Sequence, residues 1–231
     1  MTTKVFILDG AMGTILLEKG FNPPFENLCL THPEVIKGIH QDYIHAGSEI
    51  ILSHTFNAQS LNQCEAAWNM IKDLPAKKFI SIGPEANRKL IIDYFKDKAD
   101  QFVFETIYNL DLARELVTDF HSLNPIFSFC LKSSDFKEAL KLLDQYEVKI
   151  IGLNCLNGFE EAEKLLAMIP SHYEIYFKPN TGKENQDPEN FAQSLHHLMQ
   201  KFPLTYIGGC CGSTPTHIHE IQKVRRTFWQ D

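Results

Sequence analysis

The sequence predicts a single (β/α)8 barrel that spans residues 1–231. Short apolar, β-branched or aromatic runs alternate along the chain with stretches of helical periodicity. The alternation occurs eight times, and eight strand-then-helix units close into a barrel of parallel strands. The 231 residues provide about 29 residues per unit, which is near the lower end of the size range for this fold. An open doubly wound sheet, the alternative architecture, would need fewer units.

Eight short runs rich in apolar and β-branched residues are the candidate strands. They are Lys4–Asp9, Glu49–Ser53, Lys78–Ile82, Gln101–Glu105, Pro125–Cys130, Lys149–Asn154, Glu174–Lys178 and Leu204–Gly208. No linker, low-complexity tract or break in composition separates them, so we expect one domain.

The clearest helical candidates are His32–Ala46, Asn87–Lys98, Leu110–His121, Asp135–Tyr146, Phe159–Met168, Pro188–Lys201 and Thr214–Trp229. Within the fourth of these, apolar residues recur at the i, i+3, i+4, i+7 spacing of one buried stripe. Three of the helices are preceded by a capping residue and a proline, which is typical of a helix start. These start signals are Thr31-His-Pro-Glu34, Asp187-Pro-Glu189 and Ser213-Thr-Pro215. The weakest unit is the second, because Ala58–Pro75 is only faintly helical.

Charge and hydropathy exclude two classes of protein. The chain has 22 Lys and Arg against 29 Asp and Glu, a formal net charge of -7, and no basic cluster, which argues against a nucleic-acid-binding protein. No apolar stretch approaches the ~20 residues that span a bilayer. The run Val5–Leu8 is interrupted by Asp9 and does not resemble a signal peptide. We therefore expect a cytoplasmic protein without membrane contact, whose six cysteines are reduced.

Chemically active side chains are concentrated at the ends of the candidate strands. In a (β/α)8 barrel the active site lies at the carboxyl ends of the strands, so these positions are the ones to inspect. They carry Asp9-Gly10, His54, Glu105-Thr106, Asn154-Cys155, Lys178 and the segment Gly208-Gly-Cys-Cys-Gly212.

Three cysteines, Cys155, Cys210 and Cys211, are expected to converge on this rim. Cys155 follows the sixth strand and the Cys210-Cys211 pair follows the eighth, so their strands are ~10 Å apart or less. Cysteine side chains that each place a sulfur ~2.3 Å from a shared zinc ion can bridge this gap. Glycines on both sides of Cys210-Cys211 permit a bend that turns both sulfurs toward one ion. Three protein ligands and one open position are typical of a catalytic zinc site, and zinc deprotonates a thiol that binds there.

The other three cysteines, Cys29, Cys64 and Cys130, are predicted to be small apolar fillers. The same interpretation would apply to Cys155 if it stood alone. The neighbouring Cys210-Cys211 pair in its glycine-rich setting favours metal binding instead.

The remaining strand-end residues leave alternatives open. Asp9-Gly10 is consistent with a strand-terminating turn. Glu105 follows an apolar run and needs a cation, either a substrate ammonium group or a structural Lys or Arg. Lys178 could form a Schiff base, as in aldolase-type barrels, or be a solvated charge at the rim. His54 could act as a base or have no role.

Seven motifs along the chain then point to a family. They are Ile7-Leu-Asp-Gly-Ala-Met-Gly-Thr14, His54-Thr-Phe-Asn57, Gly83-Pro84, Phe104-Glu-Thr106, Gly152-Leu-Asn-Cys155, Pro179-Asn-Thr-Gly182 and Gly208-Gly-Cys-Cys-Gly-Ser-Thr-Pro-Thr-His-Ile218. In this order they resemble the zinc-dependent homocysteine S-methyltransferase family. Within it the chain is most similar to the homocysteine-binding domain of cobalamin-dependent methionine synthase.

The resemblance implies a (β/α)8 barrel that transfers a methyl group from a donor to the thiol of homocysteine and forms methionine. It implies Zn²⁺ as the cofactor, with Cys155, Cys210 and Cys211 as its ligands. It also implies that the amino-acid part of the substrate is bound by Asp9, Gly10 and Glu105, with backbone groups near Ala11 at the carboxylate. No catalytic residue is implied beyond the thiolate that the metal activates.

This chain departs from the family in the length of three segments. The segments from Asn57 to Gly83, from Asn87 to Phe102 and after Cys130 are shorter than in typical members. The donor could be S-methylmethionine, S-adenosylmethionine, or methylcobalamin on a partner protein. An alternative is a module that binds homocysteine and zinc without a donor site of its own. A Schiff-base lyase that uses Lys178 is a third possibility, and selenohomocysteine would fit the same chemistry as homocysteine.

Overall fold

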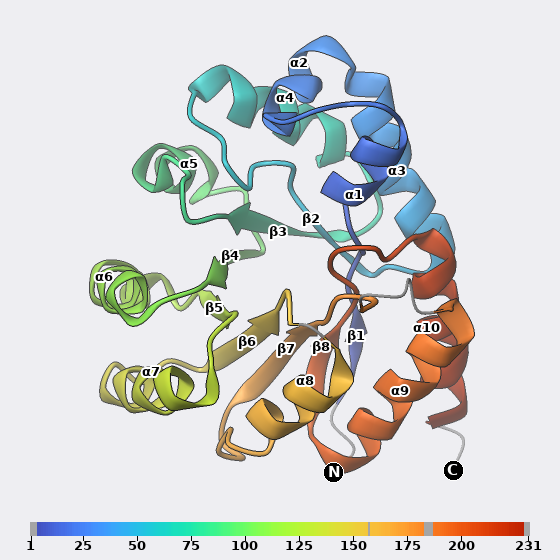
Figure 1. Cartoon of the computed structure of the whole chain (residues 1–231). Coiled ribbons are helices and arrows are strands. Elements are labelled where there is room, and N and C mark those ends of the chain that lie inside the picture. The colour runs from blue at the N-terminus through green and yellow to red at the C-terminus, as the bar shows by residue number, and fades with distance from the viewer. Residues whose placement is uncertain (1–3, 157, 183–186, 229–231) are drawn as a thin grey trace.

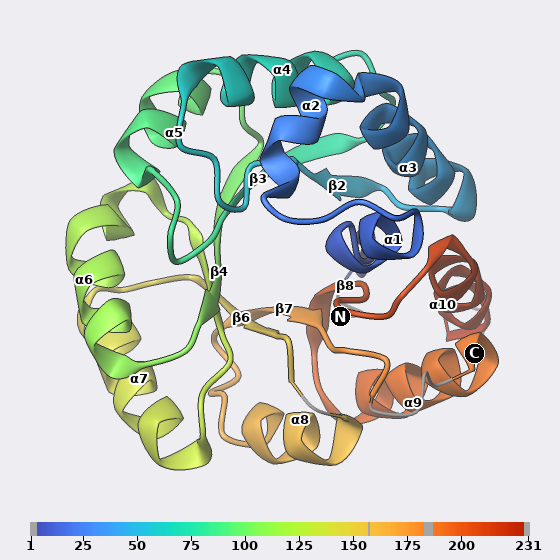
Figure 2. The ribbon, with the colours of Figure 1, turned by 45° about the horizontal axis from the view of Figure 1, so that its top comes forward.

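The computed structural model describes residues 4–156, 158–182 and 187–228. These residues form eight parallel strands in the order β1-β8-β7-β6-β5-β4-β3-β2, a nearly closed barrel with helices between the strands (Figure 1). Strands that follow one another in the chain lie side by side, and the helices form a ring around them (Figure 2). The (β/α)8 barrel that the sequence predicts is confirmed.

All eight strands occur where the sequence places them, with small differences at their ends. They are β1 (Phe6–Ile7), β2 (Ile50–Leu52), β3 (Lys77–Ile82), β4 (Gln101–Ile107), β5 (Ile126–Phe129), β6 (Ile150–Asn154), β7 (Glu174–Lys178) and β8 (Leu204–Ile207). The first strand is shorter than expected. The Leu8 amide still donates to the Ile207 carbonyl of β8 at 2.7 Å, and the next two residues, Asp9 and Gly10, line the site.

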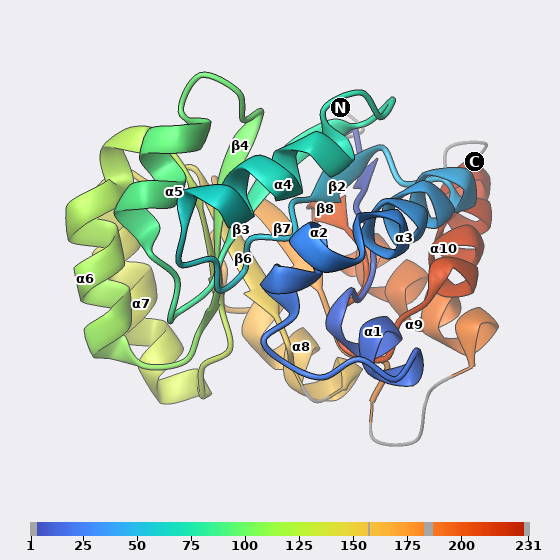
Figure 3. The ribbon, with the colours of Figure 1, turned by 90° about the horizontal axis from the view of Figure 1, so that it is seen from above.

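The helices are α1 (Gly13–Glu18), α2 (Leu28–Thr31), α3 (Pro33–Ala46), α4 (Leu61–Ile71), α5 (Arg88–Phe95), α6 (Leu110–Phe120), α7 (Ser133–Gln145), α8 (Phe159–Leu166), α9 (Pro188–Lys201) and α10 (Pro215–Phe228), with 3-10 turns η1 (Phe25–Asn27) and η2 (His121–Leu123). The short helices α1 and α2 were not among the predicted elements. The end predicted for the last helix, Trp229, lies outside the described residues. Helices α6 and α7 lie on the side of the barrel opposite α9 and α10 (Figure 3).

The second unit contains a regular helix, α4, although its sequence is only faintly helical. The Ser60 hydroxyl accepts a hydrogen bond from the Gln63 amide, and the Gln63 side chain accepts one from the Ser60 amide. This reciprocal capping box satisfies two amides at the start of the helix. Its Ser-x-x-Gln pattern is visible in the sequence.

Of the start signals in the sequence, the one at Asp187 acts as expected, because its carboxylate accepts from the Glu189 amide at 3.1 Å. The prediction was wrong for Thr31. The cap position of α3 is taken by His32, which makes no side-chain capping bond, and the Thr31 hydroxyl donates to the Asn27 carbonyl instead.

The barrel closes between β1 and β2 largely through side chains. These strands are at the two ends of the sheet order, and the Glu49 amide donates to the Ile7 carbonyl at 2.8 Å. The Glu49 carboxylate accepts from the Ile7 amide at 3.0 Å and forms an ion pair with Arg225 of α10, which also donates to the Val5 carbonyl. A carboxylate and a guanidinium thus replace part of a strand ladder.

Apolar side chains fill the barrel and the layer between strands and helices. A cluster that includes Leu8, Phe79, Val103 and Tyr176 occupies the interior. Because this interior is packed, open space for a ligand is found at the ends of the strands. The stripe predicted in α7 is confirmed, since Phe136, Ala139, Leu140 and Leu143 are all buried. None of the helices in the described part of the chain combines the length and apolar character of a transmembrane segment.

Candidate metal and substrate site

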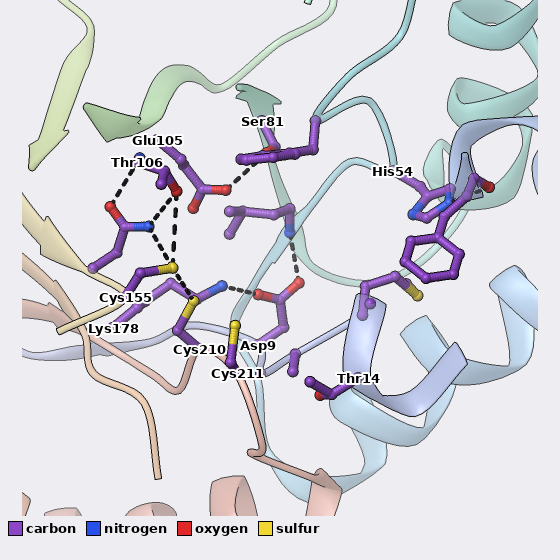
Figure 4. Close-up of a pocket in the computed structure, with 18 of the residues that line it drawn as sticks. Asp9, Thr14, His54, Ser81, Glu105, Thr106, Cys155, Lys178, Cys210 and Cys211 are labelled. Atoms are coloured by element: carbon purple, nitrogen blue, oxygen red, sulfur yellow. Dashed lines mark hydrogen bonds and ion pairs between the residues drawn. The ribbon is translucent and has the colours of Figure 1, made fainter. Parts of the chain in front are cut away.

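A cavity of about 440 Å³ opens at the carboxyl ends of the strands. Acidic, basic and sulfur-bearing side chains meet on its walls (Figure 4). Its lining includes Asp9, Gly10, Ala11, His54, Glu105, Cys155, Lys178, Cys210 and Cys211. Residues far apart in the chain therefore form one site.

The structure brings Cys155, Cys210 and Cys211 together. Cys155 directly follows β6, and the other two follow β8. Their Sγ atoms all lie within 4.8 Å of one another, and those of Cys155 and Cys210 are 3.0 Å apart. Sulfur ligands ~2.3 Å from a tetrahedral zinc ion are ~3.8 Å apart. The three sulfurs therefore fit a zinc ion with small adjustments, and they leave one position for a further ligand.

Cys155 is held in place by Asn154 and Thr106. Cys155 and Thr106 both adopt the left-handed backbone conformation, with φ of 56° and 60°, which is strained for residues other than glycine. The Asn154 side chain accepts from the Thr106 amide at 3.1 Å and donates to the Thr106 hydroxyl at 3.0 Å and to the Cys155 sulfur at 3.3 Å. One amide group thus fixes the irregular end of β4 and the sulfur after β6.

The Cys210-Cys211 turn is fixed by the loop after β7. The Cys210 amide donates to the Pro179 carbonyl at 2.8 Å, and the Cys211 amide donates to the Asn180 side chain at 3.1 Å. Gly209 packs so closely on Ser213 that an added Cβ would lie 2.4 Å from the Ser213 Cβ. The glycine therefore permits the approach that turns the two cysteines toward Cys155.

The thiols do not share negative charge evenly. Contacts with the Cys155 and Cys210 thiols lower the pKa of Cys211, whereas contacts with Cys210 and Cys211 raise the pKa of Cys155. Cys211 is the most exposed of the three. Thiolates brought this close together repel one another, and a metal cation bound between them would relieve that repulsion.

Asp9 and Lys178 form a buried ion pair on the neighbouring wall. The Lys178 ammonium donates to Asp9 Oδ1 at 2.7 Å, and the Leu52 amide donates to Oδ2 at 2.8 Å. Burial raises the pKa of the Asp9 carboxyl, and the Lys178 charge opposes that rise. For Lys178, burial lowers the pKa, but the charges of Asp9 and Glu105 outweigh it and leave the pKa above its ordinary value.

Neither sequence interpretation of Lys178 agrees with this position. The residue is 4% exposed, so it is not a solvated charge at the rim. A Schiff base requires the neutral amine, and the ion pair with Asp9 favours the protonated form instead. Lys178 is therefore a fixed cation of the site.

Glu105 lies across the cavity from this pair (Figure 4). Its two oxygens accept from the hydroxyls of Ser81 and Tyr176, both at 2.8 Å. Burial raises the pKa of the Glu105 carboxyl, with a smaller opposing effect from Lys178. The two hydroxyls fix the orientation of the carboxyl group, which lines the cavity without an ion-pair partner among the described residues.

The backbone at Gly10 and Ala11 forms the next part of the wall. A Cβ on Gly10 would lie 2.6 Å from the Tyr43 hydroxyl and 2.7 Å from that of Ser213, so the position requires glycine. The Ala11 amide donates to Ser213 Oγ at 3.0 Å, and its carbonyl accepts from Tyr43 at 2.7 Å. Both polar groups of Ala11 therefore have partners within the protein.

The other candidates lie as follows. His54 lines the cavity with its Nε2 atom 2.8 Å from the Phe25 carbonyl oxygen, and burial lowers the pKa of its ring. Cys29 and Cys64 are buried fillers, as predicted, and Cys130 is half-buried. None of the three belongs to the sulfur cluster found among the described residues.

Four residues that shape the site were not predicted from the sequence: Tyr43, Ser81, Tyr176 and Ser213. Asn154 was named at its strand end, where it directly precedes a metal-ligand candidate, but it was given no role. The others act through partners that are 24 to 202 residues away, which no local pattern reveals.

Comparisons with known proteins identify the family of the chain. The family described as homocysteine S-methyltransferase matches residues 6–90 and 86–225. Methionine synthases of Mycobacterium leprae and Mycobacterium tuberculosis are each 25% identical over 293 residues, covering 96% of the chain. The chain spans 24% of the length of these two relatives.

Solved structures share the fold. The homocysteine methyltransferase MmuM from Escherichia coli matches in its apo form with a TM-score of 0.74 and 23% identity, covering 96% of both chains. Its metallated form matches with a TM-score of 0.73 and 20% identity, covering 95% of this chain and 96% of that one. The barrel described above is thus a known arrangement.

Proposed function

Because the chain belongs to the homocysteine S-methyltransferase family, we propose that it transfers a methyl group to the thiol of homocysteine and forms methionine. The observation that carries the proposal is the cluster of three cysteine sulfurs within 4.8 Å of one another, beside a wall that presents two carboxylates. The cluster suits a thiol-binding metal, and the carboxylates suit the ammonium group of an amino acid.

Cys155, Cys210 and Cys211 would hold a zinc ion. When bound, zinc supplies the positive charge that keeps a substrate thiol deprotonated at neutral pH. Asn154 and Asn180 keep the ligands in place through the bonds described above, and the Ser213 hydroxyl donates to the Cys210 carbonyl at 2.7 Å. Three thiols must stay reduced for this role, which supports a reducing compartment such as the cytoplasm.

The amino-acid end of homocysteine would lie against Asp9, Gly10, Ala11 and Glu105. Glu105 attracts the ammonium group, and the backbone at Gly10 and Ala11 forms the wall beside the carboxylate. Fixing both ends of the substrate orients its sulfur toward the open side of the cavity, where a methyl group must approach in line. No side chain is needed as a general base, because the metal makes the thiolate available.

The methyl donor would be S-methylmethionine, S-adenosylmethionine, or methylcobalamin carried by a separate protein. A second candidate function is a module that binds homocysteine and zinc but depends on a methyl-carrying partner. The short connection between β5 and α7, from Cys130 to Lys132, favours this alternative, because it leaves little chain to cover a donor. A panel of the three donors separates the two functions.

The experiment compares Cys210→Ser and Cys211→Ser with the wild type. Zinc content is measured by mass spectrometry after anaerobic purification, and methionine formation is measured with each donor. We expect each variant to lose zinc and activity together. Cys130→Ser is the matched control, since it removes a nearby thiol outside the cluster and should keep both. Full zinc and full activity in the two ligand variants would refute the proposal.

A further inference from the structure

Lys178 is a charged group of the site to which the proposed function assigns no role. It ends β7, and its ammonium lies 2.7 Å from Asp9 Oδ1. The two side chains are 5% and 6% exposed, so water does not screen their interaction. A cation of the protein therefore already occupies one of the two carboxylates expected to bind the substrate ammonium.

The other oxygen of Asp9 also has a partner within the protein. Oδ2 accepts from the Leu52 amide at 2.8 Å, so Asp9 and Glu105 each accept two bonds, and Asp9 differs in that one of its donors is a cation. The pair joins the end of β1 to the ends of β2 and β7. The Asp9–Lys178 pair has a net charge of zero. A substrate ammonium group placed beside the pair would be repelled by Lys178 as well as attracted by Asp9.

Glu105 differs from Asp9 in its partners. Its oxygens accept from Ser81 and Tyr176, which are neutral hydroxyl donors. Each carboxylate oxygen has two lone pairs, so each can accept one further bond. In the described part of the chain, the salt bridges found include one to Asp9 and none to Glu105. Glu105 thus faces the cavity with hydroxyl partners and no ion-pair partner among the described residues, whereas Asp9 is paired with Lys178.

We propose that Lys178 determines how this site recognises its amino acid: it withdraws Asp9 from substrate binding, so that Glu105 alone receives the ammonium group. This inference rests on the proposed function, because it takes the substrate to be an amino acid whose thiol lies at the cysteine cluster. Lys178 acts through Asp9 and is therefore a positioning residue for recognition.

The test measures how much the ammonium group contributes to binding. Zinc-loaded protein is titrated calorimetrically with homocysteine and with 4-mercaptobutyrate, which keeps the thiol and the carboxylate but lacks the amino group. The dissociation constant of 4-mercaptobutyrate divided by that of homocysteine measures how much the ammonium group contributes to binding. A charge-assisted hydrogen bond is worth about a 10- to 100-fold change in affinity, so the wild-type ratio should fall in this range.

Three variants distinguish the roles of the carboxylates. Glu105→Gln should reduce the ratio to about 1. Lys178→Met should raise it at least about fivefold above the wild type, because Asp9 then becomes a second partner for the ammonium. The double variant Asp9→Asn with Lys178→Met should return to the wild-type ratio. It removes both charges together and leaves no unpaired buried ion, so it is expected to fold.

Two results would overturn the inference. If the ratio in the double variant fell to the value expected for Glu105→Gln, Asp9 would be a direct partner of the ammonium in the wild type. If Lys178→Met left the ratio unchanged while zinc content and melting temperature were retained, Lys178 would be merely structural. Failure of the zinc-loaded wild type to bind either thiol would instead refute the proposed function, and the inference with it.

Discussion

His40 should make the stability of the barrel depend on pH. It lies in α3 and is completely buried, and neither ring nitrogen has a hydrogen-bond partner among the described residues. Burial, together with the nearby His54, lowers the pKa of the His40 ring from 6.5 to about 3. The ring therefore stays neutral in the folded protein under conditions in which it is protonated in the unfolded chain.

The sign follows from proton linkage. Below pH 6.5, His40 binds a proton in the unfolded chain, but in the folded protein it stays neutral until about pH 3. Folding stability is therefore lost as the pH falls through this window. At pH 5 the unfolded His40 is protonated roughly 30 to 1, and RT ln 30 is about 2 kcal/mol. We therefore expect the neutral His40 ring to lower the free energy of unfolding by about 2 kcal/mol when the pH is lowered from 7.5 to 5.

The assay compares the wild type with His40→Leu by urea unfolding at both pH values, with chelator and reductant present throughout. The wild type should lose about 2 kcal/mol more than the variant on acidification, whatever the variant does to stability at pH 7.5. His45→Gln is the matched control, because it changes an exposed histidine of the same helix. Equal acid losses in the wild type and His40→Leu would refute the reasoning.

Two further outcomes are expected. Asn154→Ala should weaken zinc affinity by roughly 10- to 100-fold in a chelator competition, because the amide that holds Cys155 and Thr106 is removed. Asn69→Ala on the exposed face of α4 serves as its control, and an unchanged affinity in Asn154→Ala would contradict the role of Asn154. Arg225→Met should lower the free energy of unfolding by roughly 1–2 kcal/mol, because the Glu49 carboxylate and the Val5 carbonyl lose a donor where β1 meets β2. The exposed Arg226→Met should change it little, and equal effects of the two arginine variants would show that the seam does not depend on this ion pair.

Much of the fold could be predicted because its signals are local. Each strand is a short apolar run, and each of the long helices α6, α7 and α9 has a continuous apolar stripe. The position of the site followed from topology, since parallel strands bring their carboxyl ends to one rim. Asp9, Glu105, Cys155 and Cys210 were candidates for that reason alone. The faint helicity of α4 was misleading, because the helix begins with a capping box and buries Cys64, Ala67 and Ile71 at helical spacing.

The sequence by itself determined the barrel and the set of side chains at its rim, because periodicity and strand-end position depend only on neighbouring residues. Only the tertiary structure decided how those side chains share their charges. That Lys178 pairs with Asp9, that Ser81 and Tyr176 hold Glu105, and that Ser213 bonds the amide of Ala11 all depend on distances between strands. Ion pairs and hydrogen bonds act over a few ångströms in space, and that proximity is created only when the barrel closes.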